Sequence, residues 1–289
     1  MRDLDETTIT EAVLASFAQT PDPRLRRLVD SLVTHLHAFV RDTEPTIAEW
    51  AKAIDFLTRV GQISVGGRQE FILLSDVLGV STLVDTINHR GEADLTPTTV
   101  LGPFYLNNPQ VLEQGADIAQ GEAGTPMGVD VRICSTDGGP LAGATVDVWQ
   151  ASAQGLYDVQ MPDRPGQRLR GRFRTDSAGR LKFRTIVPCA YPIPDDGPVG
   201  DLLAATGRHP WRPAHVHFRI EAEGHETLVT HVFIAGDRYL ESDAVFSVKD
   251  GLVVDLGAPD EAAASRDLRY VFSLAPARAA PDRLAGAAP

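Results

Sequence analysis

The chain has 289 residues, of which 43% are hydrophobic and 23% are charged, a composition typical of a globular protein with a substantial core. Its formal net charge of −12 argues against a nucleic-acid partner, because phosphate binding requires a basic surface. No apolar run approaches the roughly 20 residues of a membrane span. The first residues lack the apolar core of a signal peptide and only two cysteines are present, so we expect a cytoplasmic protein without a disulfide framework.

Residues 1–95 have the spacing of amphipathic helices. Asp22 is a predicted N-cap, because a proline at the first helical position and leucines at helical spacing follow it. The pair Thr46 and Glu49 fits a capping box, which predicts a second helix. A further helical stretch is predicted over 69–88. We therefore expect a helical N-terminal domain whose apolar stripes pack on each other, on the rest of the chain or on a second subunit.

From residue 96 onward, short segments of alternating apolar residues are separated by turns rich in glycine and proline. Such segments at about 8–12-residue spacing are typical of a sandwich or barrel. We predict a mainly β protein with an antiparallel β-sandwich catalytic domain over 96–274. The stretch 275–289 is rich in Ala, Pro and Gly, which predicts a loosely ordered tail. The expected strands are 129–133, 144–149, 172–175, 181–184, 216–220 and 228–234.

A His-Val-His segment beginning at His215 is the most informative motif. Side chains two apart on a strand project from the same face, so His215 and His217 point together while Val216 takes the apolar face. Two imidazoles on one face can share a transition metal, although a strand histidine is more often structural. Tyr157 and Tyr191 could add anionic oxygens, which suit ferric iron better than zinc. Taken alone, each tyrosine would be a core or turn residue.

Several segments in chain order resemble the intradiol ring-cleavage dioxygenases, which include catechol, chlorocatechol and hydroxyquinol 1,2-dioxygenases. The resemblance runs from about residue 71 to about residue 256. It implies an antiparallel β-sandwich catalytic domain and one Fe(III) per subunit, with Tyr157, Tyr191, His215 and His217 as the metal ligands. The matching segments are 101–105, 149–151, 155–157, 188–191, 196–198, 207–217 and 235–240.

Within that family, the segments 191–194, 209–211, 229–231 and 242–246 look like the hydroxyquinol branch. Catechol enzymes typically carry Gln where this chain has His231. The resemblance therefore implies cleavage of hydroxyquinol (1,2,4-trihydroxybenzene) with O2 to 3-hydroxy-cis,cis-muconate and maleylacetate, in aromatic catabolism. It also implies a substrate pocket made by Leu73, Asp76, Val100, Gly102, Pro103, Phe104, Ile193, Pro194, Arg212 and Val245.

The same resemblance implies catalytic roles for three residues. Tyr191 would take a substrate proton and Arg212 would stabilise negative charge that develops on the ring. His231 would lie near the substrate or oxygen, although on its own it would be a partly buried strand histidine. Asp76 would accept a hydrogen bond from the additional hydroxyl of hydroxyquinol. From its own surroundings, Asp76 would be a surface carboxylate on a helix.

Other interpretations stay open. The first is a catechol or chlorocatechol 1,2-dioxygenase with the same iron chemistry. The second is a non-catalytic β-sandwich binding module, and the third is a zinc hydrolase that uses the His-x-His pair. The resemblance further implies a homodimer formed through the N-terminal helices, which in some members encloses a phospholipid.

Overall fold

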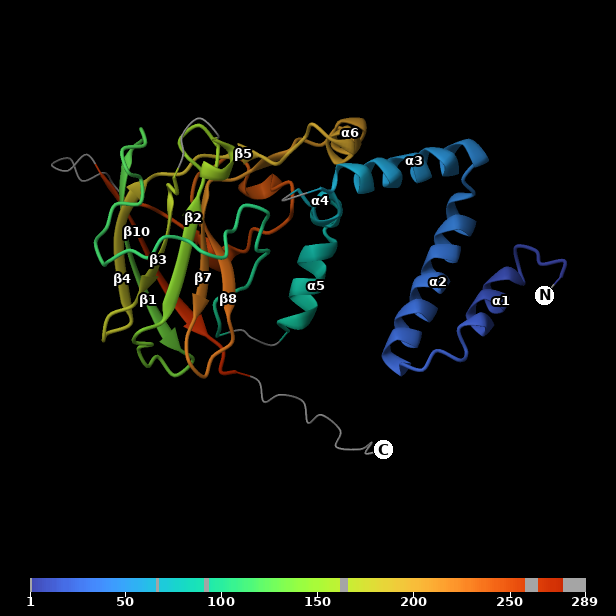
Figure 1. Ribbon diagram of the computed structural model, residues 1–289, viewed down its shortest axis with the longest axis horizontal. Helices are drawn as coiled ribbons and strands as arrows, with labels where there is room; N and C mark the ends of the chain where they lie inside the picture. Colours follow the sequence, from blue (N-terminus) through green and yellow to red (C-terminus); the bar gives the residue numbers. More distant parts are fainter. Residues whose placement is uncertain (1, 66–67, 91–93, 162–165, 258–264, 278–289) are drawn as a thin grey trace. The chain divides into compact units, whose positions relative to one another are not determined.

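The computed structural model describes residues 2–65, 68–90, 94–161, 166–257 and 265–277 (Figure 1). The chain divides into two compact units, Met1–Arg59 and Val60–Pro289. No helix within the described ranges is long and apolar enough to cross a membrane. The helices are α1 (Ile9–Ser16), α2 (Pro23–Thr43), α3 (Ile47–Ile63), α4 (Glu70–Val77), α5 (Val80–Asn88) and α6 (Pro198–Ala205).

Helices α2 and α3 begin at the predicted caps. The Asp22 side chain accepts hydrogen bonds from the backbone N–H groups of Arg24 (2.8 Å) and Leu25 (3.2 Å). Thr46 donates its backbone N–H to Glu49 Oε2 at 2.8 Å, and Glu49 donates its own to Thr46 Oγ1 at 3.2 Å. This reciprocal pair is the capping box that the sequence predicts.

The helical stretch predicted over 69–88 is interrupted, because α4 and α5 are separate helices. Gly79 between them has a φ of 72°, in the left-handed region that ends an α-helix. Immediately after this break, Thr82 Oγ1 donates a hydrogen bond to the carbonyl of Val245 at 3.1 Å. The break thus lets α5 approach a loop of the β-rich part of the same unit.

Two sheets form the β-rich body (Figure 1). Their strands are β1 (Pro126–Ser135), β2 (Thr145–Gln150), β3 (Arg170–Arg174), β4 (Arg180–Ile186), β7 (His215–Glu221), β8 (Leu228–Ile234), β9 (Val253–Val254) and β10 (Arg266–Leu274). One sheet has the order β3-β2-β7-β8-β9 and the other β10-β1-β4. A separate short pair joins β5 (Tyr191–Pro192) to β6 (Trp211–Arg212).

The predicted fold class, mainly β with N-terminal helices, is confirmed, but the sheets are mixed rather than purely antiparallel. Strand β10 runs parallel to β1, and β9 runs parallel to β8. Parallel neighbours need a long crossover connection rather than a hairpin. A hairpin-based interpretation of the sequence therefore did not find these two strands.

The hydrophobic core lies between the two sheets. Val129, Val131 and Ile133 enter it from β1, and Val216 and Phe218 enter it from β7, all at 2% exposure or less. Because side chains alternate along a strand, the two histidines of β7 lie on the opposite face of the five-stranded sheet. The candidate metal residues are therefore buried outside the sandwich core, beneath the loops that cover that face.

Part of the predicted tail is described. Ala277 donates its backbone N–H to the carbonyl of Gly224, and Ala275 accepts one from Glu226. Residues 278–289 lie outside the described part of the chain. The proposed domain boundary between residues 95 and 96 stays a prediction.

Candidate metal centre

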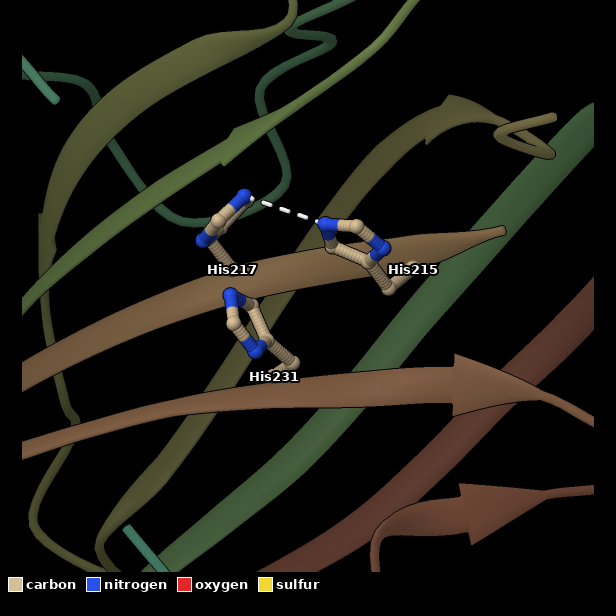
Figure 2. A group of neighbouring side chains, drawn as sticks. All are labelled: His215, His217 and His231. Atoms are coloured by element: carbon tan, nitrogen blue, oxygen red, sulfur yellow. Dashed lines mark hydrogen bonds between the residues drawn. The ribbon is translucent and has the colours of Figure 1, made fainter. Parts of the chain in front are cut away.

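His215 and His217 project from the same face of β7, as their spacing predicts. Both are 1% exposed, and their Nε2 atoms are 3.1 Å apart. His231 lies opposite His217 in the register of β7 and β8, and Figure 2 shows its ring beside the other two. Within the described ranges, these are the residues among His, Cys, Asp and Glu that form a possible metal group, with ligand atoms within 4.8 Å of one another.

The hydrogen bond of His215 defines its tautomer. Its Nδ1 lies 2.7 Å from the carbonyl oxygen of Pro213, which can only accept, so Nδ1 carries the proton. Burial and the nearby charge of Arg212 lower the pKa of His215 to about 3, so the ring is neutral. The Nε2 atom, which contacts His217 Nε2 at 3.1 Å, then carries the lone pair that a metal would use, in the arrangement that metal-bound histidines adopt.

Two tyrosines approach the same point. Tyr157 Oη is 3.0 Å from His217 Nε2. The ring of Tyr191 lies 5.2 Å from that of Tyr157 and 5.4 Å from that of His215, centroid to centroid. Burial and the neighbouring Tyr191 raise the pKa of Tyr157 well above its usual value. A bound cation reverses this preference and favours the phenolate.

The residues present fit a transition metal. His217 Nδ1 and both ring nitrogens of His231 are buried without a hydrogen-bond partner in the described structure. Such atoms are costly unless water, ligand or metal satisfies them. Two imidazoles and two phenols converge, and phenolate oxygen favours a hard ferric ion over zinc. The structure therefore brings together the four residues that the resemblance names as metal ligands.

Aromatic rings and one glycine hold these side chains in place. Trp149 stacks on His217 with centroids 4.5 Å apart, and Phe104 stacks on Tyr157 at 4.4 Å. Gly102 has a φ of 75°, and a Cβ built there would lie 3.4 Å from the His217 ring. Glycine thus allows the covering loop to approach the histidine closely.

A buried ion pair supports Tyr157 from behind. Its neighbour Asp158 accepts a hydrogen bond from Arg170 Nε at 2.7 Å, and Arg170 Nη1 donates to the Phe104 carbonyl at 3.0 Å. The pair thereby joins the Tyr157 segment to the loop that carries the stacking partner of Tyr157. Neither Arg170 nor Asp158 stands in a sequence motif that predicts this role, because their partners lie on separate segments.

A cavity of about 430 Å³ lies beside this centre, between α4 and the loop that carries Phe104. Asp76 lies there with 5% exposure, and its Oδ1 has no hydrogen-bond partner in the described structure. Burial raises the pKa of the Asp76 carboxyl. The cavity lining includes five of the expected substrate-contacting residues, namely Leu73, Asp76, Pro103, Phe104 and Pro194.

The other expected pocket residues lie outside the lining of that cavity. Ile193 and Val245 are buried, and Val100 and Gly102 are partly buried. Arg212 is 3% exposed, with Nη1 3.4 Å from Tyr191 Oη. Arg212 thus faces the candidate ligands rather than the cavity wall.

Comparison with known protein families agrees with this geometry. The family model described as Dioxygenase matches residues 100–276, and the one described as Catechol dioxygenase N terminus matches residues 22–96. The chain is 52% identical to 6-chlorohydroxyquinol 1,2-dioxygenase of Cupriavidus pinatubonensis over 88% of this chain and 92% of the relative. It is 49% identical to hydroxyquinol 1,2-dioxygenase of Rhizobium sp. over 92% and 90% of the two chains.

Solved structures give the same assignment. Hydroxyquinol 1,2-dioxygenase from Pseudomonas putida superposes with a TM-score of 0.88 at 45% identity, covering 94% of this chain and 99% of that one. Catechol 1,2-dioxygenase from Pseudomonas arvilla gives 0.80 at 33% identity, covering 99% and 96%. With its donor cluster, its sandwich and these matches, the chain belongs to the iron-dependent family of intradiol ring-cleavage dioxygenases.

Proposed function

We propose that the protein cleaves the ring of hydroxyquinol between its two adjacent hydroxyl-bearing carbons. Dioxygen supplies both added oxygen atoms, and the product is 3-hydroxy-cis,cis-muconate, which tautomerises to maleylacetate. The observation that carries the proposal is the convergence of two histidines and two tyrosines beside a cavity that contains the buried carboxyl of Asp76. Relatives named hydroxyquinol 1,2-dioxygenase, at 44–49% identity, support the choice of substrate.

We also propose that Tyr157, Tyr191, His215 and His217 hold one ferric ion per subunit. When bound, the ion would supply the Lewis acidity that makes a coordinated diol reactive towards dioxygen. The neutral His215 is suited to this role because the Pro213 carbonyl already fixes its other nitrogen.

The remaining roles belong to side chains around that set. Tyr191 accepts a substrate proton, and Arg212 stabilises the negative charge that develops on the ring. The 3.4 Å contact between Arg212 Nη1 and Tyr191 Oη supports both assignments. Asp76 binds the third hydroxyl of hydroxyquinol. His231 hydrogen-bonds to substrate or dioxygen, a role supported by its two unpartnered nitrogens.

The test is oxygen uptake by purified protein of known iron content, with autoxidation subtracted. Hydroxyquinol, 6-chlorohydroxyquinol and catechol are compared at matched concentrations. Faster uptake with hydroxyquinol than with catechol supports the proposal, and a preference for the chlorinated triol would assign this chain the substrate named for its Cupriavidus relative. A preference for catechol selects the catechol alternative. A purified protein that contains zinc and has no visible colour would favour the hydrolase alternative. A purified protein that contains no metal would favour the binding module.

We further propose that the protein is a cytoplasmic homodimer assembled through its N-terminal helices, with an apolar interface that can enclose a phospholipid. Helix α2 supports this, because Leu32 is 64% exposed and Phe39 is 58% exposed within the described structure. Exposed apolar residues of this size mark interaction surfaces when they are contiguous. Lipid extraction followed by mass spectrometry tests for the phospholipid.

A further inference from the structure

The guanidinium of Arg212 is held along one edge by two buried side chains. Its Nε donates to Asp243 Oδ1 at 3.1 Å, and its Nη2 donates to Asp243 Oδ2 at 3.3 Å and to Ser247 Oγ. Asp243 is 4% exposed and Ser247 is 1% exposed. These bonds use three of the five N–H groups of the guanidinium. Nη1, which they leave out, lies 3.4 Å from Tyr191 Oη.

Asp243 is also held in place by hydrogen bonds within its own loop. Its Oδ1 accepts the backbone N–H of Val245 at 3.3 Å, and its Oδ2 accepts the backbone N–H and hydroxyl of Ser247 at 3.1 and 2.7 Å. Burial opposes ionisation of Asp243, but the charge of Arg212 and these hydrogen bonds outweigh burial and hold its pKa below the usual value. A fixed carboxylate can impose one orientation on its arginine.

The loop that carries Asp243 and Ser247 is tied to the helices. Phe246 has a φ of 57°, a left-handed conformation that bulky residues rarely adopt. The Arg208 guanidinium lies 4.8 Å from the centre of the Phe246 ring and donates to the carbonyls of Val77 and Ala244. Strained backbone held by its surroundings is common where a side chain must be aimed.

A second bidentate arginine–aspartate pair, elsewhere in the same unit, provides a comparison. Arg172 donates Nε and Nη2 to Asp147 at 2.6 and 2.7 Å, and the Asp147 side chain is 1% exposed. The Arg172 side chain is 28% exposed, whereas that of Arg212 is 3% exposed. Arg212 also donates from Nη1, on its other edge, to the hydroxyl of the candidate ligand Tyr191. This second contact distinguishes the two pairs.

We propose that Asp243, completed by Ser247, is the positioning residue of Arg212 and aims Nη1 at the bound aromatic substrate. The role of Arg212 rests on the proposed function. Asp243 acts only through the arginine, since both carboxylate oxygens are engaged by Arg212 and its own loop. Loss of the clamp therefore lowers turnover without removing the metal ligands.

The first test is a double-mutant cycle with Asp243→Asn and Arg212→Gln, measured as kcat and KM for the diol that the wild type cleaves. We expect Asp243→Asn alone to lower kcat by about 10- to 100-fold, as misplacement of a catalytic group does, with a much smaller change in KM. In the Arg212→Gln background it should cause no further loss, because the two residues act as one unit. Ser247→Ala should lower kcat in the same direction by less.

Asp147→Asn is the matched control, because it makes the same change in the Arg172–Asp147 pair, where the described hydrogen bonds of the arginine go to Asp147 and to the Asn107 carbonyl. We expect it to lower the melting temperature while kcat per iron stays close to that of the wild type. Additive losses in the cycle, or an equal loss of kcat in Asp147→Asn, would overturn the proposal. Loss of iron or visible colour in Asp243→Asn would also overturn it, because Asp243 would then support the metal.

The second test is the crystal structure of Asp243→Asn beside that of the wild type. We expect the Arg212 guanidinium to leave its wild-type position or to occupy more than one. A guanidinium that stays in place overturns the clamp. This result does not depend on any substrate. If the wild-type protein cleaved no diol, the proposed function would be contradicted, but the two crystal structures would still show whether Asp243 positions Arg212.

Discussion

At the scale of single residues, Asp76 is the residue that we propose distinguishes one diol from another in the cavity. The carboxyl is buried, and its Oδ1 is unpartnered among the described residues. Burial raises its pKa, while a hydrogen bond from Ser81 and the charge of Arg212 oppose that effect. A third hydroxyl on the substrate would satisfy Oδ1, whereas catechol would leave it unpaired.

Replacement of Asp76 by Ala should therefore lower the preference for hydroxyquinol over catechol. A hydrogen bond to a charged or strongly polarised group contributes about 1.5–3 kcal/mol, so the ratio of the two kcat/KM values should fall by about 10- to 100-fold. Leu78→Ala is a control on the same helix segment, because Leu78 is 59% exposed. An unchanged ratio in Asp76→Ala would remove Asp76 from substrate selection.

Tyr157→Phe should weaken iron retention and change the visible colour, because the variant loses a phenolate oxygen within 3.0 Å of His217 Nε2. The measurements are iron per subunit after dialysis against a chelator and the visible absorption spectrum. Tyr105→Phe is the matched control, since the Tyr105 hydroxyl bonds to Asp147 at 2.8 Å instead. Full iron and unchanged colour in Tyr157→Phe would contradict its role as a ligand.

The three buried histidines predict acid sensitivity of the iron-free protein. Burial lowers the pKa of each ring, to about 3 for His215, whereas an unfolded histidine titrates near about 6.5. Between those values the unfolded chain binds more protons, so stability falls as the pH falls. On lowering the pH through this window, the melting temperature of His231→Gln should fall less than that of the wild type. The two decreases should differ by about 2–4 °C, the shift that 1 kcal/mol produces at about this size. Equal slopes would contradict a neutral, buried His231.

The sequence predicts His215 and His217 as a pair because strand periodicity is local, and the structure bears this out at 3.1 Å. The clamp on Arg212 could not be predicted in this way. Asp243 lies 31 residues further along the chain, and its contact depends on a loop conformation that includes a left-handed phenylalanine. In the sequence, Asp243 stands out only as part of the segment 242–246 that resembles the hydroxyquinol branch, and that resemblance does not predict a contact with Arg212.

At the scale of elements, the turn before Tyr157 packs directly against the strand that carries Tyr191. Gly155 has a φ of 78°, and a Cβ built there would lie 3.1 Å from Tyr191 Cβ and 3.4 Å from the Ala190 carbonyl oxygen. Gly143 has a φ of 69° but no atom within 4 Å of its built Cβ. An alanine at either position would strain the backbone, but only at Gly155 would its Cβ also crowd neighbouring atoms.

Gly143→Ala should cost about 1–2 kcal/mol of stability, the penalty of a left-handed alanine, and should keep its iron. Gly155→Ala should lose more stability and also retain less iron, because it displaces Tyr191. Thermal melts and iron content, measured on both variants, check this. Equal iron retention in the two variants would show that the Gly155 turn does not set the position of Tyr191.

Element boundaries show which signals are local. The start of α2 could be predicted from the sequence, because the Asp22 cap bonds to backbone N–H groups of its own helix. The break between α4 and α5 and the short helix α6 depend on packing within the second unit. Periodicity alone therefore predicted one stretch over 69–88 and did not predict α6. Strand β10 was missed because its partner β1 is distant in sequence and parallel.

At the scale of the whole molecule, α2 carries apolar residues that need a partner. Five of them are at least 49% exposed within the described structure, namely Leu25, Leu28, Leu32, Leu36 and Phe39. Such residues recur at helical spacing on one face, as expected of a helix that packs against another surface. In the proposed homodimer, a second copy of the chain covers these apolar residues.

Analytical ultracentrifugation should therefore give twice the mass of one chain at micromolar concentration. Leu32→Glu should shift the equilibrium towards monomer, because a charge buried in an apolar interface without a partner is strongly unfavourable. Val271→Glu is the control, since Val271 is 58% exposed on β10, outside the proposed interface. A wild-type monomer at every concentration, or equal dissociation in both variants, would show that α2 does not form the dimer.

Oxygen uptake per iron should stay the same in the Leu32→Glu monomer, because the candidate ligands and the cavity residues all lie within the second unit.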